Sequence, residues 1–164
     1  MAILPLLRYP DPRLKLPCAP VDRFDARLAA LARDLTDSMR AAPGIGITAA
    51  HAGILERLVV IEIDGPASTR VYVNPEITWS SPERAQHTEG SVSMQGVTDT
   101  VERPTRVRVR YQGLDGSEHA EEADGLLSVC LQHEIDQIDG VFWIERLSRL
   151  KRERIVRKYR KTAG

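Results

Sequence analysis

The spacing of hydrophobic residues along the chain predicts two amphipathic helices. From Asp25 onward, apolar residues recur every three or four positions until Pro43 and Gly44 interrupt the pattern. This period places them on one face of a helix of about four turns, with Asp22 or Asp25 as the N-cap. The same period returns over residues 126–138, where the apolar stripe consists of Leu127, Leu131, Ile135 and Ile138.

Shorter apolar and alternating runs predict strands between these helices. Residues 58–63 and 71–73 are apolar runs separated by an Asp-Gly-Pro turn signal. Residues 106–111 alternate charged and apolar positions, as a half-buried strand does, and a hairpin turn follows at 113–116. We therefore expect Arg106, Arg108 and Arg110 to share a solvent-exposed face.

The two ends of the chain differ in character. Residues 4–21 contain five prolines, which predict an extended arm because proline fixes φ and removes a hydrogen-bond donor. Residues 147–161 place Ile155 and Tyr159 among many basic residues and predict a C-terminal surface helix. Nine basic residues and one acid lie between Arg146 and Lys161. Such a run is either a solvated helix face or a contact for nucleic acid.

Composition restricts the class of protein further. A chain of 164 residues with 42% hydrophobic and 28% charged residues predicts one globular domain over residues 1–164. Lys plus Arg equals Asp plus Glu at 23 each, so there is no general electrostatic case for binding DNA. No apolar run has the length of a membrane span, and no leader pattern is present, so we expect a cytoplasmic protein without a membrane partner. Cys18 and Cys130 are expected to be free thiols.

Three segments carry residues of chemical interest. His133 and Glu134 are adjacent in the second helix, and a His-Glu pair on a helix is what a hydrolytic metal site uses as ligand and base. The familiar zinc pattern needs a second His four residues on, but position 137 is Gln, and a lone His is commonly structural. Residues 44–51, GIGITAAH, contain alternate glycines that permit close backbone approach. Residues 89–93, EGSVS, supply hydroxyl groups.

In this order and at these separations, the three segments resemble the signature motifs of peptide deformylases. Those motifs are G-x-G-x-A-A-x-Q, E-G-C-L-S and Q-H-E-x-D-H. Residues 9–14, YPDPRL, resemble the family's N-terminal P-D-x-R-L, and the resemblance covers essentially the whole chain. It implies an α+β peptide deformylase fold, with small antiparallel sheets around a central helix that carries an HExxQ-type motif, and with a C-terminal helix.

The resemblance also implies a reaction centre. In this family a divalent iron or similar ion is held by the Cys of the second motif and both His of the third, while the Glu is the general base. The first-motif Gln and the backbone N–H after the Cys receive the oxyanion. Carried over, Glu134 is the base, His133 a ligand, Val92 the backbone donor, and Gly46 a matching first-motif residue. Three positions depart from the pattern, namely His51 for the Gln, Ser91 for the Cys and Gln137 for the second His.

These departures weaken the expected metal site. A serine hydroxyl stays neutral at pH 7 and is a poor ligand for iron or zinc, and the amide of Gln137 lacks the imidazole nitrogen that these metals favour. Without the ion, Glu134 has no activated water to deprotonate. We therefore expect no cofactor and no ordinary deformylation, with binding of peptide N-termini retained. The resemblance assigns the groove to Ile45, Gly46, Glu89, Leu126, Val129 and Cys130.

Two other hypotheses remain open at this stage. The exchanges at positions 51 and 137 are reciprocal, so His51 and His133 could hold one divalent metal (Fe, Zn or Ni) in an active deformylase or related amidohydrolase, completed by Ser91, Glu89 or water. Alternatively, Ser91 is a nucleophile with His133 or His51 as its base, although residues 89–93 do not resemble a nucleophile elbow. For the basic C-terminal helix, the resemblance suggests a contact with the ribosome.

Overall fold

A computed structural model describes residues 2–163 of the chain, and its first long helix is the one predicted from the apolar spacing. Helix α1, Ala26–Ala41, begins at Asp25, whose side chain accepts a hydrogen bond from the Leu28 backbone N–H. This N-cap satisfies one of the donors that the first helical turn leaves free. The buried face of α1 packs on β1 and β2 of the main sheet, and it consists of Leu28, Leu31, Ala32, Leu35, Ser38 and Met39.

The main sheet has five antiparallel strands in the order β1-β2-β3-β6-β7. Their bounds are Gly46–Thr48, Leu58–Ile61, Arg70–Ser80, Arg106–Gln112 and Glu118–Asp124. The predicted strands at 58–63, 71–73 and 106–111 are confirmed, as is the hairpin turn after β6. The side chains of Arg106, Arg108 and Arg110 are solvent-exposed. Arg106 and Arg108 lie over the ring of Trp79.

A second, two-stranded sheet lies beside the first, and the local pattern of residues did not predict its strands. It consists of β4, Arg84–Ser91, and β5, Met94–Pro104, joined by a tight turn at Val92 and Ser93. Residues 89–93 are the end of β4 and the turn that follows. Most positions of β4 are polar, so its sequence lacks the alternation of apolar and polar residues that predicts a strand. Pairing with β5 reveals the strand.

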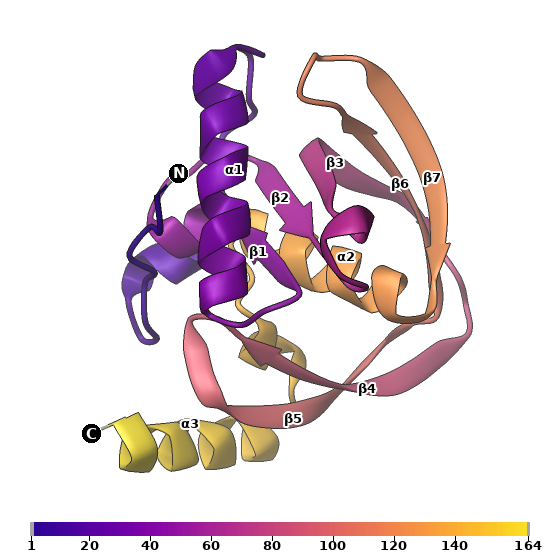
Figure 1. The fold of residues 1–164 in the computed structure, drawn as a ribbon. Coiled ribbons are helices and arrows are strands. Elements are labelled where there is room, and N and C mark those ends of the chain that lie inside the picture. The colour runs from indigo at the N-terminus through magenta and orange to yellow at the C-terminus, as the bar shows by residue number, and fades with distance from the viewer. Residues whose placement is uncertain (1, 164) are drawn as a thin grey trace.

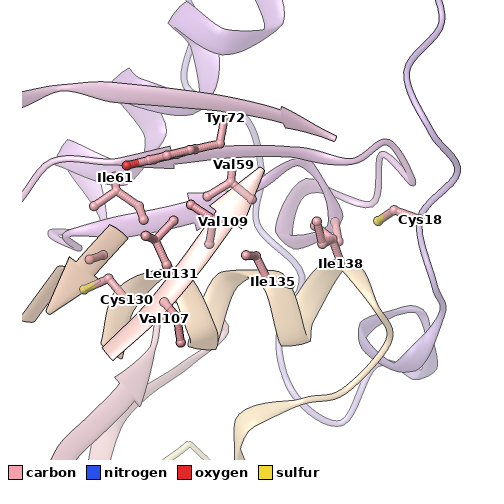
Figure 2. Packing of buried hydrophobic residues seen from close by; sticks show 12 residues of the cluster. Cys18, Val59, Ile61, Tyr72, Val107, Val109, Cys130, Leu131, Ile135 and Ile138 are labelled. Carbon is pink, nitrogen blue, oxygen red and sulfur yellow. The ribbon is translucent and has the colours of Figure 1, made fainter. Parts of the chain in front are cut away.

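The helix that carries the His-Glu pair lies in the middle of the molecule. Helix α2, Gly125–Ile138, packs against all five strands of the main sheet and is buried along nearly its whole length. Figure 2 shows Leu131 and Ile135 of α2 pointing toward Val59 of β2 and Val109 of β6. Burial on this scale is the main favourable term in folding, at about 25 cal/mol per Å² of apolar surface. The packing of the apolar side of α2 on the sheet therefore holds the polar side of the helix in a fixed position.

The two ends of the chain flank this core. The N-terminal arm is mostly extended, with a turn at residues 9–10 and a short 3₁₀ helix, Pro12–Lys15. Three of its backbone N–H groups donate to carbonyls of the core: Leu7 to His51, Tyr9 to Ser93, and Cys18 to Ile138. Helix α3, Arg149–Ala163, packs against β5 through Ile155 and Tyr159, at the bottom of the view in Figure 1. Within residues 2–163, no helix is long and apolar enough to cross a membrane.

Candidate functional site

The three motif segments meet around one cavity of about 480 Å³. Residues 42–46, before and at the start of β1, form one wall, and residues 88–92 and 94–98, around the β4–β5 turn, form another. His51 and one side of α2 close it. Every residue that the resemblance assigns to the groove lines this cavity, namely Ile45, Gly46, Glu89, Leu126, Val129 and Cys130. Segments separated by up to about ninety positions in the chain therefore form one site.

A glycine in β1 lets the backbone pass close to the glutamate of α2. A methyl group at Gly46 would overlap the carboxylate of Glu134, so no larger residue fits without movement of this side chain. Gly44 is similarly close to Val92 of the opposite wall, with 2.7 Å between the Val92 Cγ1 and the position that a Cβ would take. The alternate glycines of the first motif are thus explained by close packing on both sides of the cavity.

Glu134 itself is buried and lacks a hydrogen-bond partner at one oxygen. Its side chain lines the cavity, and Oε1 has no partner among the described residues. Burial raises the pKa of Glu134 to about 7, because the charged form loses its hydration. The carboxyl group is therefore poised to hold or release a proton near neutral pH.

His133 is oriented by a carboxylate from the second motif. Its Nδ1 lies 2.8 Å from Glu89 Oε1, so Nε2 is the ring nitrogen that this contact does not occupy. Burial lowers the pKa of His133, but the nearby Glu134 and Glu89 carboxylates outweigh it and raise the pKa above its usual value. For Glu89 the hydrogen bonds from His133 and Arg103 outweigh burial and lower the pKa to about 2, so this carboxylate stays charged.

A chain of buried ion pairs supports Glu89 from behind. Arg103 of β5 donates to both oxygens of Glu89 and also to Asp136, at 2.9 Å between Nη1 and Oδ2. Asp136 in turn accepts two hydrogen bonds from Arg146, whose side chain is partly exposed. No motif in the sequence points to Arg103 or Asp136 as site residues. For Arg103, a charged residue at an inward position of the alternating β5 strand is the feature that could have indicated a buried ion pair.

His51 occupies the end of the first motif and is almost completely buried. The backbone N–H of Thr48 donates to its Nδ1 at 3.0 Å, while Nε2 has no partner among the described residues. Burial, with a smaller contribution from nearby His133, lowers the pKa of His51 to about 3. The ring is therefore neutral over the ordinary pH range.

The other two positions that depart from the motifs behave differently from each other. Ser91 lines the cavity, and its hydroxyl oxygen accepts a hydrogen bond from the Ser93 backbone N–H at 3.1 Å. Gln137 does not line the cavity, and its amide donates to the Leu14 carbonyl at 2.7 Å. Within residues 2–163, no three or more His, Cys, Asp or Glu side chains are grouped as a metal site requires. Ser91 and Gln137 thus differ in side-chain chemistry from the Cys and His of the family motifs.

The fold and this cavity define a class of α+β protein in which a central helix presents a His-Glu pair to a groove between two small sheets. Comparison with known proteins shows the family. The family model for polypeptide deformylase matches residues 3–153. A "peptide deformylase-like" protein of Brucella melitensis biotype 1 is 58% identical over 98% of this chain and 98% of its own length. A peptide deformylase of Phenylobacterium zucineum is 43% identical over 99% of this chain and 98% of its own length.

A solved structure agrees with these sequence comparisons. The crystal structure of a peptide deformylase from Legionella pneumophila superposes with a TM-score of 0.94 at 39% identity, covering 99% of this chain and 96% of that one. The chain belongs to the polypeptide deformylase family. The expected fold class, small antiparallel sheets around the helix with the motif and a C-terminal helix, is confirmed.

Proposed function

We propose that the protein binds peptide N-termini in the cavity and does not carry out the ordinary metal-dependent removal of the N-formyl group. The observation that carries this proposal is the orientation of Gln137. Its amide is engaged with the Leu14 carbonyl and lies outside the cavity lining, so the position of the second histidine offers no donor to an ion there. Ser91 adds only a neutral hydroxyl at the position of the thiolate.

The energetic cost of these changes is large. Changes in groups that only support the ligands commonly reduce metal affinity or activity 10- to 100-fold, and here two direct ligands are replaced. Without the ion, a water molecule keeps a pKa of about 15.7 and is rarely available as hydroxide at neutral pH. Glu134 can hold a proton near the ligand, but a carboxyl group alone does not supply an activated nucleophile.

The shape of the cavity supports binding of an extended peptide end. Strand β1 is an edge of the main sheet and borders the cavity at Gly46. Extended peptides add to such an edge through main-chain hydrogen bonds, while side chains enter neighbouring pockets. Ile45 and Leu126 are exposed at 42% and 48% and line the same cavity, so they offer apolar surface to a hydrophobic first residue.

Metal analysis together with an activity assay tests this function. Protein purified without added metal is expected to contain no stoichiometric iron, nickel, cobalt or zinc and to leave a formyl-methionyl peptide uncleaved, while calorimetry detects binding of that peptide. A triple variant, Ser91→Cys with Gln137→His and His51→Gln, is expected to gain both the metal and hydrolysis. A parent protein that contains one equivalent of metal and cleaves the peptide would contradict the proposal.

A rearranged metal site is the second candidate. It is favoured by one observation, namely that His51 and His133 line the same cavity and that His51 Nε2 is without a partner. In this model one divalent ion (Fe, Zn or Ni) binds both imidazoles, and the protein is an active deformylase or a related amidohydrolase. The two models differ at a single residue, because His51→Gln would remove metal from a rearranged site and would change nothing in the metal content of a metal-free one.

A further proposal concerns the C-terminal helix. Helix α3 buries Ile155 and Tyr159 and presents most of its basic residues outward. We infer a contact between this helix and ribosomal RNA, because a run of cations on one helix attracts phosphates by counterion release. This contact would bring the cavity near emerging peptide N-termini.

A further inference from the structure

A second cavity of about 430 Å³ adjoins the first at the end of α1. Its walls come from the N-terminal arm, the last turn of α1, the β4–β5 turn and the end of α3, which gather at the lower left of the view in Figure 1. The two cavities share Ala42, Val92 and Gln95, and Gln95 is exposed, so their boundary lies at the molecular surface. The second cavity contains none of the residues assigned to the groove.

The segment before β1 marks a path from the main cavity to this boundary. Gly46 lies against the buried Glu134, at the closed end of the main cavity. Two residues earlier, Gly44 lies against Val92, which belongs to both cavities. Two residues earlier again, the backbone carbonyl at position 42 accepts a hydrogen bond from the Gln95 side-chain amide at 3.2 Å. The path therefore ends where the second cavity begins.

This path gives a bound peptide a direction. Because Glu134 lies in the closed end, a chain terminus fits there, and the rest of a peptide has to leave through the exposed side. The segment from Gly46 back to Ala42 covers four residues, which span at most roughly 14 Å when extended. The fourth or fifth residue of an extended peptide therefore reaches the boundary at Gln95.

The lining of the second cavity is largely apolar and contains a single charged residue. Leu4, Leu6 and Tyr159 contribute apolar surface from the arm and from α3, and Arg8 is the charged residue. Arg8 is exposed, and its guanidinium has no ion pair or hydrogen bond among residues 2–163. No carboxylate lines this cavity. The charge and the apolar walls together suit an apolar side chain that is followed by an acidic one.

We propose that the second cavity binds the downstream part of the peptide whose N-terminus occupies the main cavity, at about its fourth to seventh residues. This rests on the proposed function and names its substrate class, namely chains of about six residues or more with an apolar residue before an acidic one. The occupant is the same peptide because the two cavities are continuous at Val92 and Gln95. Arg8 is then the residue that favours an acid.

Calorimetry with three peptides tests the length and charge preferences. A formyl-methionyl tripeptide is compared with two heptapeptides that begin with the same three residues and continue with alanine, leucine and either two glutamates or two lysines, all with amidated C-termini. The glutamate heptapeptide should bind about tenfold more tightly than the tripeptide, because it buries the leucine. It should bind about threefold more tightly than the lysine heptapeptide.

Matched variants test the residues of the second cavity. Arg8→Ala should abolish the preference for glutamate over lysine, whereas Arg23→Ala, an exposed arginine outside both cavities, should keep it. Ala41→Trp places a large ring in the second cavity from the exposed end of α1 and should remove the gain with length, while tripeptide affinity stays within a few-fold. Ala26→Trp at the other end of α1 is the control and should keep the gain. Thermal unfolding checks that all four variants fold.

Nuclear magnetic resonance locates the bound peptide on the unaltered protein. The glutamate heptapeptide should shift the methyl resonances of Leu4 and Leu6, and the tripeptide should leave them unchanged. A heptapeptide that binds no more tightly than the tripeptide, or one that leaves these resonances unchanged, overturns the inference and leaves the proposed function standing. A preference for glutamate that persists in Arg8→Ala overturns the assignment of the acid. If the parent binds none of the three peptides, the proposed function fails, and the inference fails with it.

Discussion

The orientation of each buried polar side chain around α2 depends on its hydrogen-bond partner. His133 is held by Glu89, Gln137 by the Leu14 carbonyl, and His51 by Thr48. These hydrogen bonds orient His133 and His51 at the cavity and hold Gln137 outside its lining. The chemistry of the site is thus decided atom by atom, because each buried polar group has room for few partners.

The two cysteines give a prediction at this same scale. Burial raises the pKa of Cys18 to about 11 and that of Cys130 to about 12, because a buried thiolate loses its hydration. The thiolate is the reactive form, so both side chains should resist iodoacetamide at about pH 8 in the folded protein. Mass spectrometry over time is expected to show little alkylation, while the unfolded protein is modified at both positions. Rapid alkylation of native Cys130 would contradict the burial of this part of the cavity wall.

The raised thiol pKa values also affect stability. In the unfolded chain these thiols ionise near pH 8.5, whereas in the folded chain they stay protonated up to about pH 11. The folded state is therefore relatively less favoured as the pH rises through this window, and no change from this source is expected below it.

Between elements, the close approach of β1 to α2 depends on Gly46. Substitution Gly46→Ala places a methyl group against the Glu134 carboxylate, and we expect it to lower the free energy of unfolding by about 1 to 3 kcal/mol, as overpacking does. Chemical denaturation measures the change. In a Glu134→Ala background the same substitution should cost much less, because its obstacle is gone. An equal loss of stability in both backgrounds would show that the strain arises elsewhere.

The contact between the β4–β5 sheet and α2 depends on Arg103. Its guanidinium pairs with Glu89 and with Asp136, and its side chain is 4% exposed. Arg103→Met leaves Glu89 buried without its main counterion, and we expect a loss of about 3 to 5 kcal/mol in the free energy of unfolding.

A matched control is available in the same hairpin. Arg84 pairs with Glu102, but both side chains are at least half exposed, so Arg84→Met should cost about 1 kcal/mol or less. If both substitutions have the same effect in denaturant titrations, the buried chain of ion pairs does not stabilise the site.

For the whole molecule, charge is balanced in total but not in distribution. Lys plus Arg equals Asp plus Glu over the chain, yet α3 has a strong excess of basic residues. If α3 contacts ribosomal RNA, the double substitution Arg157→Glu with Lys158→Glu should abolish cosedimentation with ribosomes. Raising the salt from about 0.05 to about 0.2 M should also weaken binding by the parent steeply.

The same change of charge elsewhere serves as the control. Arg23 and Arg33 are exposed at positions outside α3, and Arg23→Glu with Arg33→Glu alters the net charge equally. This variant should still cosediment with ribosomes. Loss of binding by both variants would indicate a non-specific effect of net charge.

Much of the architecture was predictable because it rests on local patterns. The apolar period indicates α1 and α2, and strict alternation indicates β6, since burial of one face imposes the period of the element. Strands β4 and β7 carry mostly polar residues, so their strand character depends on pairing with the other strand of the same hairpin, β5 or β6. Local patterns do not contain that information.

The sequence by itself therefore determined the family, the principal elements and the three altered positions, His51, Ser91 and Gln137, because residue types and their order are written in the chain. Only the tertiary structure decided that Gln137 turns to Leu14, that Arg103 matches the charge of Glu89, and that the Thr48 backbone N–H lies 3.0 Å from His51 Nδ1. The physical reason is that hydrogen bonds are short and directional. Their partners are known only when segments far apart in the chain are brought within about 3 Å of each other.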